Sequence, residues 1–351
     1  MKKQLIAAAV AGAFALPAMA QVTISGSINT GLENGGQTSN SKFGVASLGG
    51  GANAININAT EDLGGGLSAG ATFQIRFSAA TGDATTSGVA NTVAANTFPG
   101  ANLMHAANVF LSSAAGTIRV GKVAEDGSCG FDPWACTGGA AMMAGTGATS
   151  SATGAATRTS LLVGAGTQAN SVYYQSPAMN GFRLSLQTTM GQRSATATAY
   201  NSADLNRVND RTVINLTYSA GPIAAQYIDI KGAQNTGQSR GDDKRTEKGY
   251  GLSYDFGVAK VSLYKADKQD ADGTKSADLT NVSATVPMGA MTLLAGYTKN
   301  NASTALSTTD SKTAVGVNYA LSKRTTLGAD AFRAEIAGGS TGYVLRARHN
   351  F

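Results

Sequence analysis

Apolar and polar residues alternate along most of the chain. In residues 22–28, and again in residues 67–77, apolar side chains occupy every second position and polar or small ones lie between them. This period of two places the two kinds of side chain on opposite faces of a β-strand. The pattern predicts sixteen strands, which begin near residues 22, 52, 67, 105, 117, 169, 182, 211, 223, 247, 259, 279, 290, 312, 325 and 341.

The connections between these strands alternate in length. The short ones are residues 61–66, 113–116, 176–181, 219–222, 256–258, 287–289 and 321–324. Long polar segments lie between them, such as residues 78–104, 123–168, 191–210 and 231–247. Short turns on one rim and long loops on the other are typical of an outer-membrane barrel, which also has an even number of strands.

The apolar face of such strands needs a neighbour. In a soluble sandwich the neighbour is a second sheet, whereas a barrel of sixteen strands is too wide to fill, so its polar face lines water and its apolar face meets lipid. Several aromatic residues lie near strand ends with the apolar parity, as expected at a membrane interface, although aromatics also fill soluble β-cores. They are Tyr218, Tyr254, Phe256, Tyr319, Tyr343 and Phe351. We expect an all-β, 16-stranded antiparallel transmembrane β-barrel, closed because lipid cannot satisfy an open edge.

The first twenty residues have the features of a secretory signal peptide. Lys2 and Lys3 precede an apolar run over residues 5–16, and small residues at 18–20 form a cleavage site,. We expect residues 1–20 to be removed and residues 21–351 to form one barrel domain. After residue 20 no apolar run reaches the roughly 18 residues of a spanning helix.

Composition narrows the function further. Charged residues make up 14% of the chain, and 44 Gly accompany only 6 Pro, which excludes a charged disordered tail and a Pro-rich linker,. Without Lys2 and Lys3 the net charge falls from +6 to +4, too dispersed for nucleic-acid binding,.

Few residues could carry covalent or metal chemistry. In an exported chain, Cys129 and Cys136 are expected to form one local disulfide. The two histidines, His105 and His349, are far apart and predict no metal site,. No nucleophile lies beside an evident base in a recognisable motif, so we expect neither an enzyme nor a cofactor.

Four segments resemble a known family: residues 60–67 (TEDLGGGL), 170–177 (NSVYYQSP), 321–325 (LSKRT) and 346–351 (RARHNF). With them the chain is similar to the Gram-negative general diffusion porins of betaproteobacterial type. The resemblance implies a homotrimer of barrels in the outer-membrane bilayer, with short periplasmic turns and long extracellular loops. It implies passive diffusion of small hydrophilic solutes and inorganic ions, and a last strand, ending in Phe351, that the barrel-assembly machinery recognises.

The resemblance also implies a constriction. The third long loop, residues 123–168, is expected to fold into the lumen, where its acids face basic side chains of the barrel wall. A disulfide within this loop would restrict its movement. The loop acids are Glu125, Asp126 and Asp132, and the predicted lumen or constriction residues of the wall are Arg76, His105, Arg119, Lys122 and Arg183, with Lys260, Arg346 and Arg348 on the same parity and Asp255 opposing them.

This excess of basic residues predicts a mild preference for anions. Related porins usually carry Arg at the position of Lys122, and often near His105 and Gln168, so the aperture is expected to be less basic than theirs. Two other functions remain open from the sequence. A non-conducting surface adhesin or structural barrel would explain export and alternation, and an outer-membrane barrel enzyme would explain the fold.

Overall fold

The computed structural model of the chain describes residues 21–34, 42–43, 53–77, 79, 104–124, 126–135, 163, 167–190, 211–232, 246–269, 273, 275–302, 311–335 and 340–351. Within these residues, 17 strands form one antiparallel sheet. One of them, β2, has only two residues. The others have 8 to 14 residues, and each begins within four residues of a predicted start, so the sixteen predicted strands are confirmed. The expected signal peptide, residues 1–20, lies outside the described residues and stays a prediction.

In chain order the strands are β1 (Gln21–Asn34), β2 (Lys42–Phe43), β3 (Ala54–Gly64), β4 (Leu67–Arg76), β5 (Met104–Ser113), β6 (Gly116–Ala124), β7 (Thr167–Gln175), β8 (Phe182–Thr189), β9 (Arg211–Ala220), β10 (Ile223–Lys231), β11 (Thr246–Asp255), β12 (Lys260–Gln269), β13 (Lys275–Met288), β14 (Met291–Asn300), β15 (Ser311–Ala320), β16 (Thr325–Glu335) and β17 (Ser340–Asn350). A short 3-10 helix, η1 (Ser128–Phe131), follows β6. No helix among the described residues is long and apolar enough to cross a bilayer.

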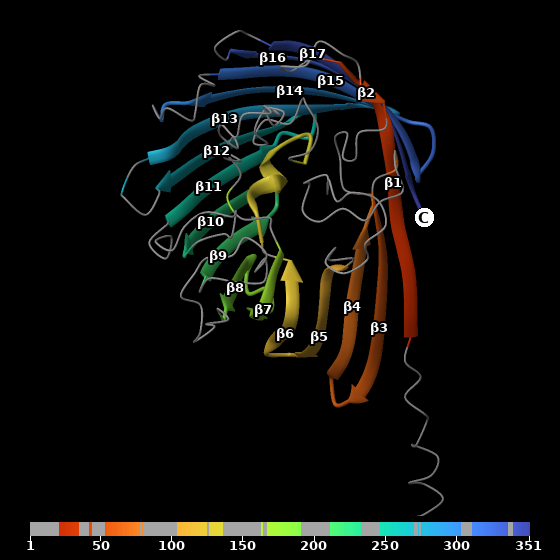
Figure 1. The fold of residues 1–351 in the computed structure, drawn as a ribbon, viewed down its shortest axis with the longest axis vertical. Coiled ribbons are helices and arrows are strands. Elements are labelled where there is room, and N and C mark those ends of the chain that lie inside the picture. Colours follow the sequence, from red (N-terminus) through yellow and green to blue (C-terminus); the bar gives the residue numbers. More distant parts are fainter. Residues whose placement is uncertain are drawn as a thin grey trace, which may run out of the picture.

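Strand β1 closes the sheet into a barrel. Its first half pairs with β3, from Gln21 to Ser27, and its second half pairs with β17, from Ser27 to Asn34. Figure 1 shows β1 beside both neighbours. The terminal residue completes the seam, because the N–H of Phe351 donates to the carbonyl of Gly26 (3.0 Å) and the N–H of Gly26 donates to the carbonyl of Phe351 (2.9 Å). Closure satisfies the backbone groups that an open edge would expose to lipid.

The two faces of the strands follow the predicted parity. On β9, the outward side chains of Ile214 and Leu216 are 41% and 40% exposed, while Arg211 and Asn215 point inward and are buried. The predicted interface aromatics are likewise on the outside, where Tyr254, Phe256, Tyr319, Tyr343 and Phe351 are all exposed and Tyr218 packs against Phe182. Apolar side chains therefore cover the outer surface, as a lipid-facing barrel requires.

Part of the inner surface departs from this rule. A buried apolar cluster lies on the inward faces of β9, β10, β12 and β13, and it includes two residues of the third loop. Its members are Phe131, Val163, Val213, Ile228, Ile230, Tyr264, Ala266 and Leu279. The prediction that the inward face is polar is wrong at this place, because Phe131 and Val163 of the third loop pack against the wall there and bury apolar side chains,.

Candidate functional site

Residues 126–135 of the third loop lie against the inside of the barrel. Near their start, Asp126 accepts hydrogen bonds from the Asn215 amide on β9 (3.0 Å) and from the Tyr173 hydroxyl on β7 (3.2 Å). Further along, the Ser283 hydroxyl on β13 donates to the carbonyl of Phe131 (3.1 Å). In Figure 1 this yellow segment lies within the ring of strands. We call the inward faces of β9–β13 and β16, which it contacts, the loop-covered wall.

The loop segment is a short, internally bonded turn. Within and after η1, the N–H of Asp132 donates to the carbonyl of Cys129 (3.2 Å), and the N–H of Ala135 donates to the carbonyl of Asp132 (2.8 Å). The carboxylate of Asp132 also accepts the backbone N–H of Trp134 (3.0 Å), a local bond typical of Asp in turns,. Ser128 joins the turn to the far end of the loop by exchanging hydrogen bonds with the backbone of Val163.

Two aromatic side chains of the turn reach the wall. The ring of Phe131 stacks on Tyr264 of β12, with centroids 5.8 Å apart. The indole N–H of Trp134, which is only 1% exposed, donates to the carboxylate of Asp330 on β16 (2.9 Å). Asp330 in turn forms a buried ion pair with Arg346 on β17. The turn is therefore attached to the wall at two points.

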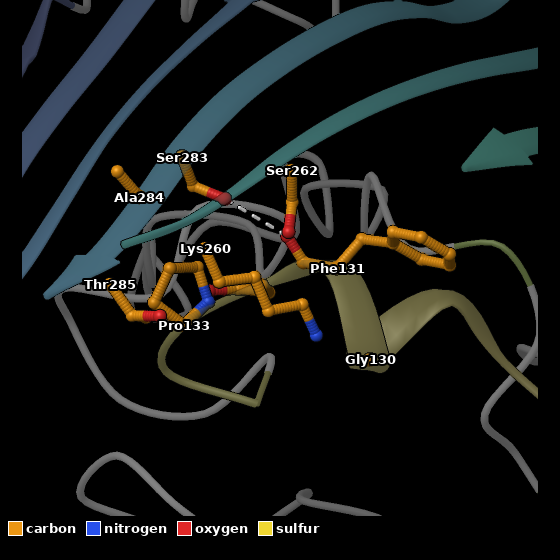
Figure 2. A pocket seen from close by; sticks show the side chains of 9 residues that line it. Gly130, Phe131, Pro133, Lys260, Ser262, Ser283, Ala284 and Thr285 are labelled. Carbon is orange, nitrogen blue, oxygen red and sulfur yellow. Dashed lines mark hydrogen bonds between the residues drawn. The ribbon is translucent and has the colours of Figure 1, made fainter. Parts of the chain in front are cut away.

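A small pocket remains between the turn and the wall (Figure 2). Its volume is about 110 Å³, and its lining combines the Lys260 side chain with the hydroxyl groups of Ser262, Ser283 and Thr285. Loop residues 130–133 form the other side. The loop thus follows the wall closely and leaves room for only a few water-sized molecules.

Basic side chains gather on a different part of the wall, which we call the basic arc: Arg76 on β4, His105 on β5, and Arg119 and Lys122 on β6. His105 is buried, and Lys122 donates to the carbonyl of its chain neighbour Met104. Irregular pairing brings them together, since the register shifts between β4 and β5 beside Ile75 and between β6 and β7 beside Lys122. Such bulges redirect side chains.

Gly121 makes one of these irregularities possible. Its φ is +130°, a backbone conformation that side chains other than hydrogen rarely allow,. A Cβ there would also meet the carbonyl oxygen of Ala107 at 2.5 Å. The glycine therefore permits the bulge from which Lys122 reaches the carbonyl of Met104 (2.7 Å).

The described part of the loop meets the basic arc at one place. At the junction of the two regions, Arg119 pairs across the ladder with Tyr173, whose hydroxyl donates to Asp126 of the loop. The structure therefore places Asp126 of the loop beside the Arg119 end of the basic arc.

Other predicted residues lie elsewhere. Arg183 is exposed near the short-turn end of β8, and Lys260 lines the pocket under the turn. Arg346 has the predicted inward parity, but it is buried against Asp330. Glu125 lies outside the described residues. Asp126 accepts from two neutral donors, and Asp132 accepts the backbone N–H of Trp134, as described above.

The expected disulfide falls partly outside the described residues, because Cys136 is not among them. Within the described part of the chain, Cys129 has no disulfide partner. The Cys129–Cys136 bridge stays a prediction, which thiol counting on the denatured, unreduced protein would check.

Comparison with known proteins shows what this architecture is. The family model described as "Gram-negative porin" matches residues 7–335. The chain belongs to the Gram-negative porin family. It is an outer-membrane channel, with a water-filled lumen through which small hydrophilic solutes and ions diffuse passively, and not an enzyme.

Individual relatives agree with this assignment. Outer membrane porin protein 32 of Delftia acidovorans is 27% identical to the porin over 305 residues, covering 82% of this chain and 77% of that one. A solved structure entitled "Anion-selective porin from Comamonas acidovorans" has 21% sequence identity, covers 95% of this chain and 100% of its own, and gives a TM-score of 0.68. OmpT of Vibrio cholerae, solved in a trimer form, gives a TM-score of 0.59 at 12% identity, covering 95% and 99%. At these identities the two structures show the shared fold.

Sequence reasoning missed the residues that attach the loop. Phe131, Trp134, Tyr264 and Asp330 were not among the predicted site residues. One signal was available: Gly249 and Gly251 stand at inward positions of β11, where glycine indicates a close approach of other atoms,. The identity of those atoms depends on the path of the loop.

Proposed function

We propose that the porin conducts small anions in preference to cations, and that the lumen between the basic arc and the third loop is its narrowest passage. The observation that carries this proposal is the difference in how the two sets of charges are paired. Within the described part of the chain, Arg76, Arg119 and Lys122 form no ion pair with a carboxylate. Their hydrogen bonds go to neutral oxygens, those of Gln74, Asn108 and Met104.

Two of the loop acids, Asp126 and Asp132, lie among the described residues, and both have hydrogen-bond partners other than the basic arc. Asp126 is turned toward Asn215 and Tyr173 on the wall, and Asp132 is only 5% exposed and accepts the backbone N–H of Trp134. Positive charge is therefore left in the passage, and it raises the local concentration of anions. Because a wide lumen lets ions keep most of their water, the preference is modest. The similar Comamonas acidovorans structure is named as anion-selective, which supports the same sign.

The test is the reversal potential across a planar bilayer with a KCl gradient. The wild-type porin is expected to favour chloride. The double variant Arg76→Gln and Lys122→Gln should lose most of that preference. The matched control removes the same charge from inward positions outside the arc, Arg183→Gln with Lys260→Gln, and should change the potential less. A wild-type preference for cations, or equal effects of both pairs, would refute the proposal.

We further propose that the porin is a homotrimer. The trimer form of the similar OmpT fold supports this assembly. Conductance steps in groups of three, and a trimer mass in detergent, are the expected results. Single steps from a monomeric species would contradict it.

The last strand is proposed to serve as the signal for the barrel-assembly machinery. In support, Phe351 completes the seam between β17 and β1, and its ring packs over Gly26. Deleting Phe351 should lower the amount of folded barrel in the outer membrane while leaving synthesis unchanged. Replacement of the penultimate Asn350 by Ser is the control, and normal assembly without Phe351 would contradict the role.

A further inference from the structure

We propose that glycine residues in the wall form two seats for the aromatic side chains of the third loop, and that these seats set how far the loop projects into the lumen. Phe131 occupies the first seat and Trp134 the second. The inference rests on the third loop lining the narrowest passage, as proposed above. It identifies wall residues, remote from the basic arc, that determine the aperture.

The first seat is a depression over β11. A Cβ built on Gly251 would overlap the ring of Phe131, and one built on Gly249 would overlap the hydroxyl of Tyr264. Gly251 and Tyr264 are paired across the β11–β12 ladder, so the tyrosine ring lies beside the space that the glycines leave. Phe131 enters this space and stacks on Tyr264 at 5.8 Å. Any larger residue at position 251 would occupy the volume of the ring.

The second seat is built from two cross-strand pairs on β15, β16 and β17. Gly316 is paired with Asp330, and Gly328 is paired with Arg346. A Cβ on Gly316 would overlap the Asp330 carboxylate, and one on Gly328 would lie 2.5 Å from the Arg346 guanidinium carbon. The glycines let the ion pair lie flat on the wall, where Arg346 also donates to Asn318.

Trp134 covers this ion pair. Its indole N–H donates to Asp330, and the tryptophan, Asp330 and Arg346 are 1%, 5% and 8% exposed. A buried ion pair is stable only when its remaining hydrogen-bonding groups are satisfied, so the indole is a specific partner and not an accidental contact. The second seat therefore fits an aromatic side chain that carries an N–H donor, as tryptophan does.

The two seats act through one rigid segment. Phe131 and Trp134 are three residues apart on the turn closed by the Cys129, Asp132 and Ala135 backbone bonds. Attachment of a stiff turn at two separated points fixes both its distance from the wall and its orientation. A methyl group in the first seat must push the Phe131 ring, and the turn with it, toward the lumen.

The experiment compares Gly251→Ala with Gly130→Ala. Both add one methyl group, but a Cβ on Gly130, in the turn itself, meets nothing within 4 Å. Two quantities are measured on the folded porin: unit conductance in planar bilayers, and acrylamide quenching of Trp134, the single tryptophan of the chain. Gly251→Ala should lower unit conductance by about a third, since conduction depends on pore diameter, and should raise quenching. Gly130→Ala should change neither.

A second variant tests the fit directly. Adding Phe131→Ala to Gly251→Ala removes the ring that the methyl displaces, so conductance should return to the wild-type value or exceed it. Failure to recover would overturn the seat, because the loss would then have another origin. If Gly251→Ala does not yield a folded barrel, Phe131→Ala alone is measured in the wild-type wall. It should raise both quenching and conductance, and wild-type values of both would overturn the inference.

The outcomes separate this inference from the proposed function. Wild-type quenching and conductance in Gly251→Ala would overturn the seat and leave the anion preference, which the reversal potential measures, untouched. Raised quenching with wild-type conductance would show a displaced loop that does not limit the passage, which would overturn the proposed constriction and the aperture role together. Lower conductance with raised quenching supports both.

Discussion

Ile228 and Arg76 both point into the barrel, yet they have opposite surroundings. Ile228, on the loop-covered wall, is fully buried in an apolar cluster with Phe131 and Tyr264. Arg76, on the basic arc, is only partly buried and donates to the neutral side chain of Gln74. Inward-pointing residues therefore have one of two environments in this porin. Where the loop lies on the wall, inward residues form a small dry core, and where it does not, they line the passage.

The charges of the two regions differ in the same way. On the loop-covered wall, Arg211 and Lys268 both lie within ion-pair distance of Glu247, at 3.7 and 3.3 Å. On the basic arc, Arg119 and Lys122 use neutral acceptors. Among the described residues, these two charges of the loop-covered wall are paired with a carboxylate and those of the arc are not. On the proposed function, the arc charges attract anions. Substitutions in the loop-covered wall should thus change the free energy of unfolding. Substitutions in the basic arc should change the ion selectivity.

The largest effect is expected from breaking the buried ion pair under Trp134. Asp330→Ala leaves Arg346 buried without its carboxylate, which should lower the free energy of unfolding by about 3–5 kcal/mol. Guanidinium unfolding of the folded porin in detergent measures it. The control, Arg333→Ala on the same strand, removes one partner of an exposed pair and should cost less than about 0.5 kcal/mol,. Equal costs would mean that the loop-covered wall is not a core.

A smaller loss of stability is expected from shortening an apolar side chain, and it should differ between the inward and outward faces of the wall. Ile228→Ala, in the dry cluster, should cost about 2–4 kcal/mol because a cavity remains. Ile214→Ala, on the outward face of β9, should cost about 1 kcal/mol, since detergent or lipid fills the space and only transfer free energy is lost. Unfolding midpoints of the two variants give the comparison. A larger cost at Ile214 would reverse the assignment of the faces.

Selectivity should respond to one region only. Arg119→Gln, on the basic arc, should lower the chloride-to-potassium permeability ratio by up to about twofold and leave the stability nearly unchanged. Arg211→Gln should cost about 2 kcal/mol of stability, because Glu247 retains Lys268, and should leave the ratio at its wild-type value. Reversal potentials and unfolding curves of both variants are the measurements. A shift in the ratio from Arg211→Gln would contradict the division.

The smallest effect is that of salt. Raising KCl from 0.1 to 1 M shortens the screening length from about 10 to about 3 Å, so the anion preference should fall by roughly half. Salt screens the buried ion pairs of the loop-covered wall much less. The thermal unfolding midpoint, measured without denaturant, should therefore change little. The test measures the reversal potential at a fixed ratio of KCl concentrations while the mean KCl concentration is raised. An anion preference that stays constant would point to selection by size.

Much of the barrel could be predicted from the sequence, because the alternation of apolar and polar residues depends only on neighbours along one strand. The exposed Ile214 and Leu216 and the inward Asn215 follow directly from residue order on one strand, and the same rule placed Arg76 and Arg119 on the lumen side. The rule that inward residues are polar does not hold at Ile228 and Ile230, which are apolar and point inward. They pack against Phe131, a loop residue about a hundred positions away in the sequence.

The sequence by itself determined the sixteen long strands, their two faces, the alternation of short and long connections and the inward parity of several basic residues. Each of these depends on neighbours in the chain, through strand pleating and turn chemistry. Only the tertiary structure decided where residues 126–135 of the third loop lie, which described charges are paired with carboxylates, and why Gly251, Gly316 and Gly328 are glycines. Those features depend on contacts between segments up to about two hundred residues apart, such as Trp134 with Asp330, and no local pattern encodes the partner of a side chain at that distance.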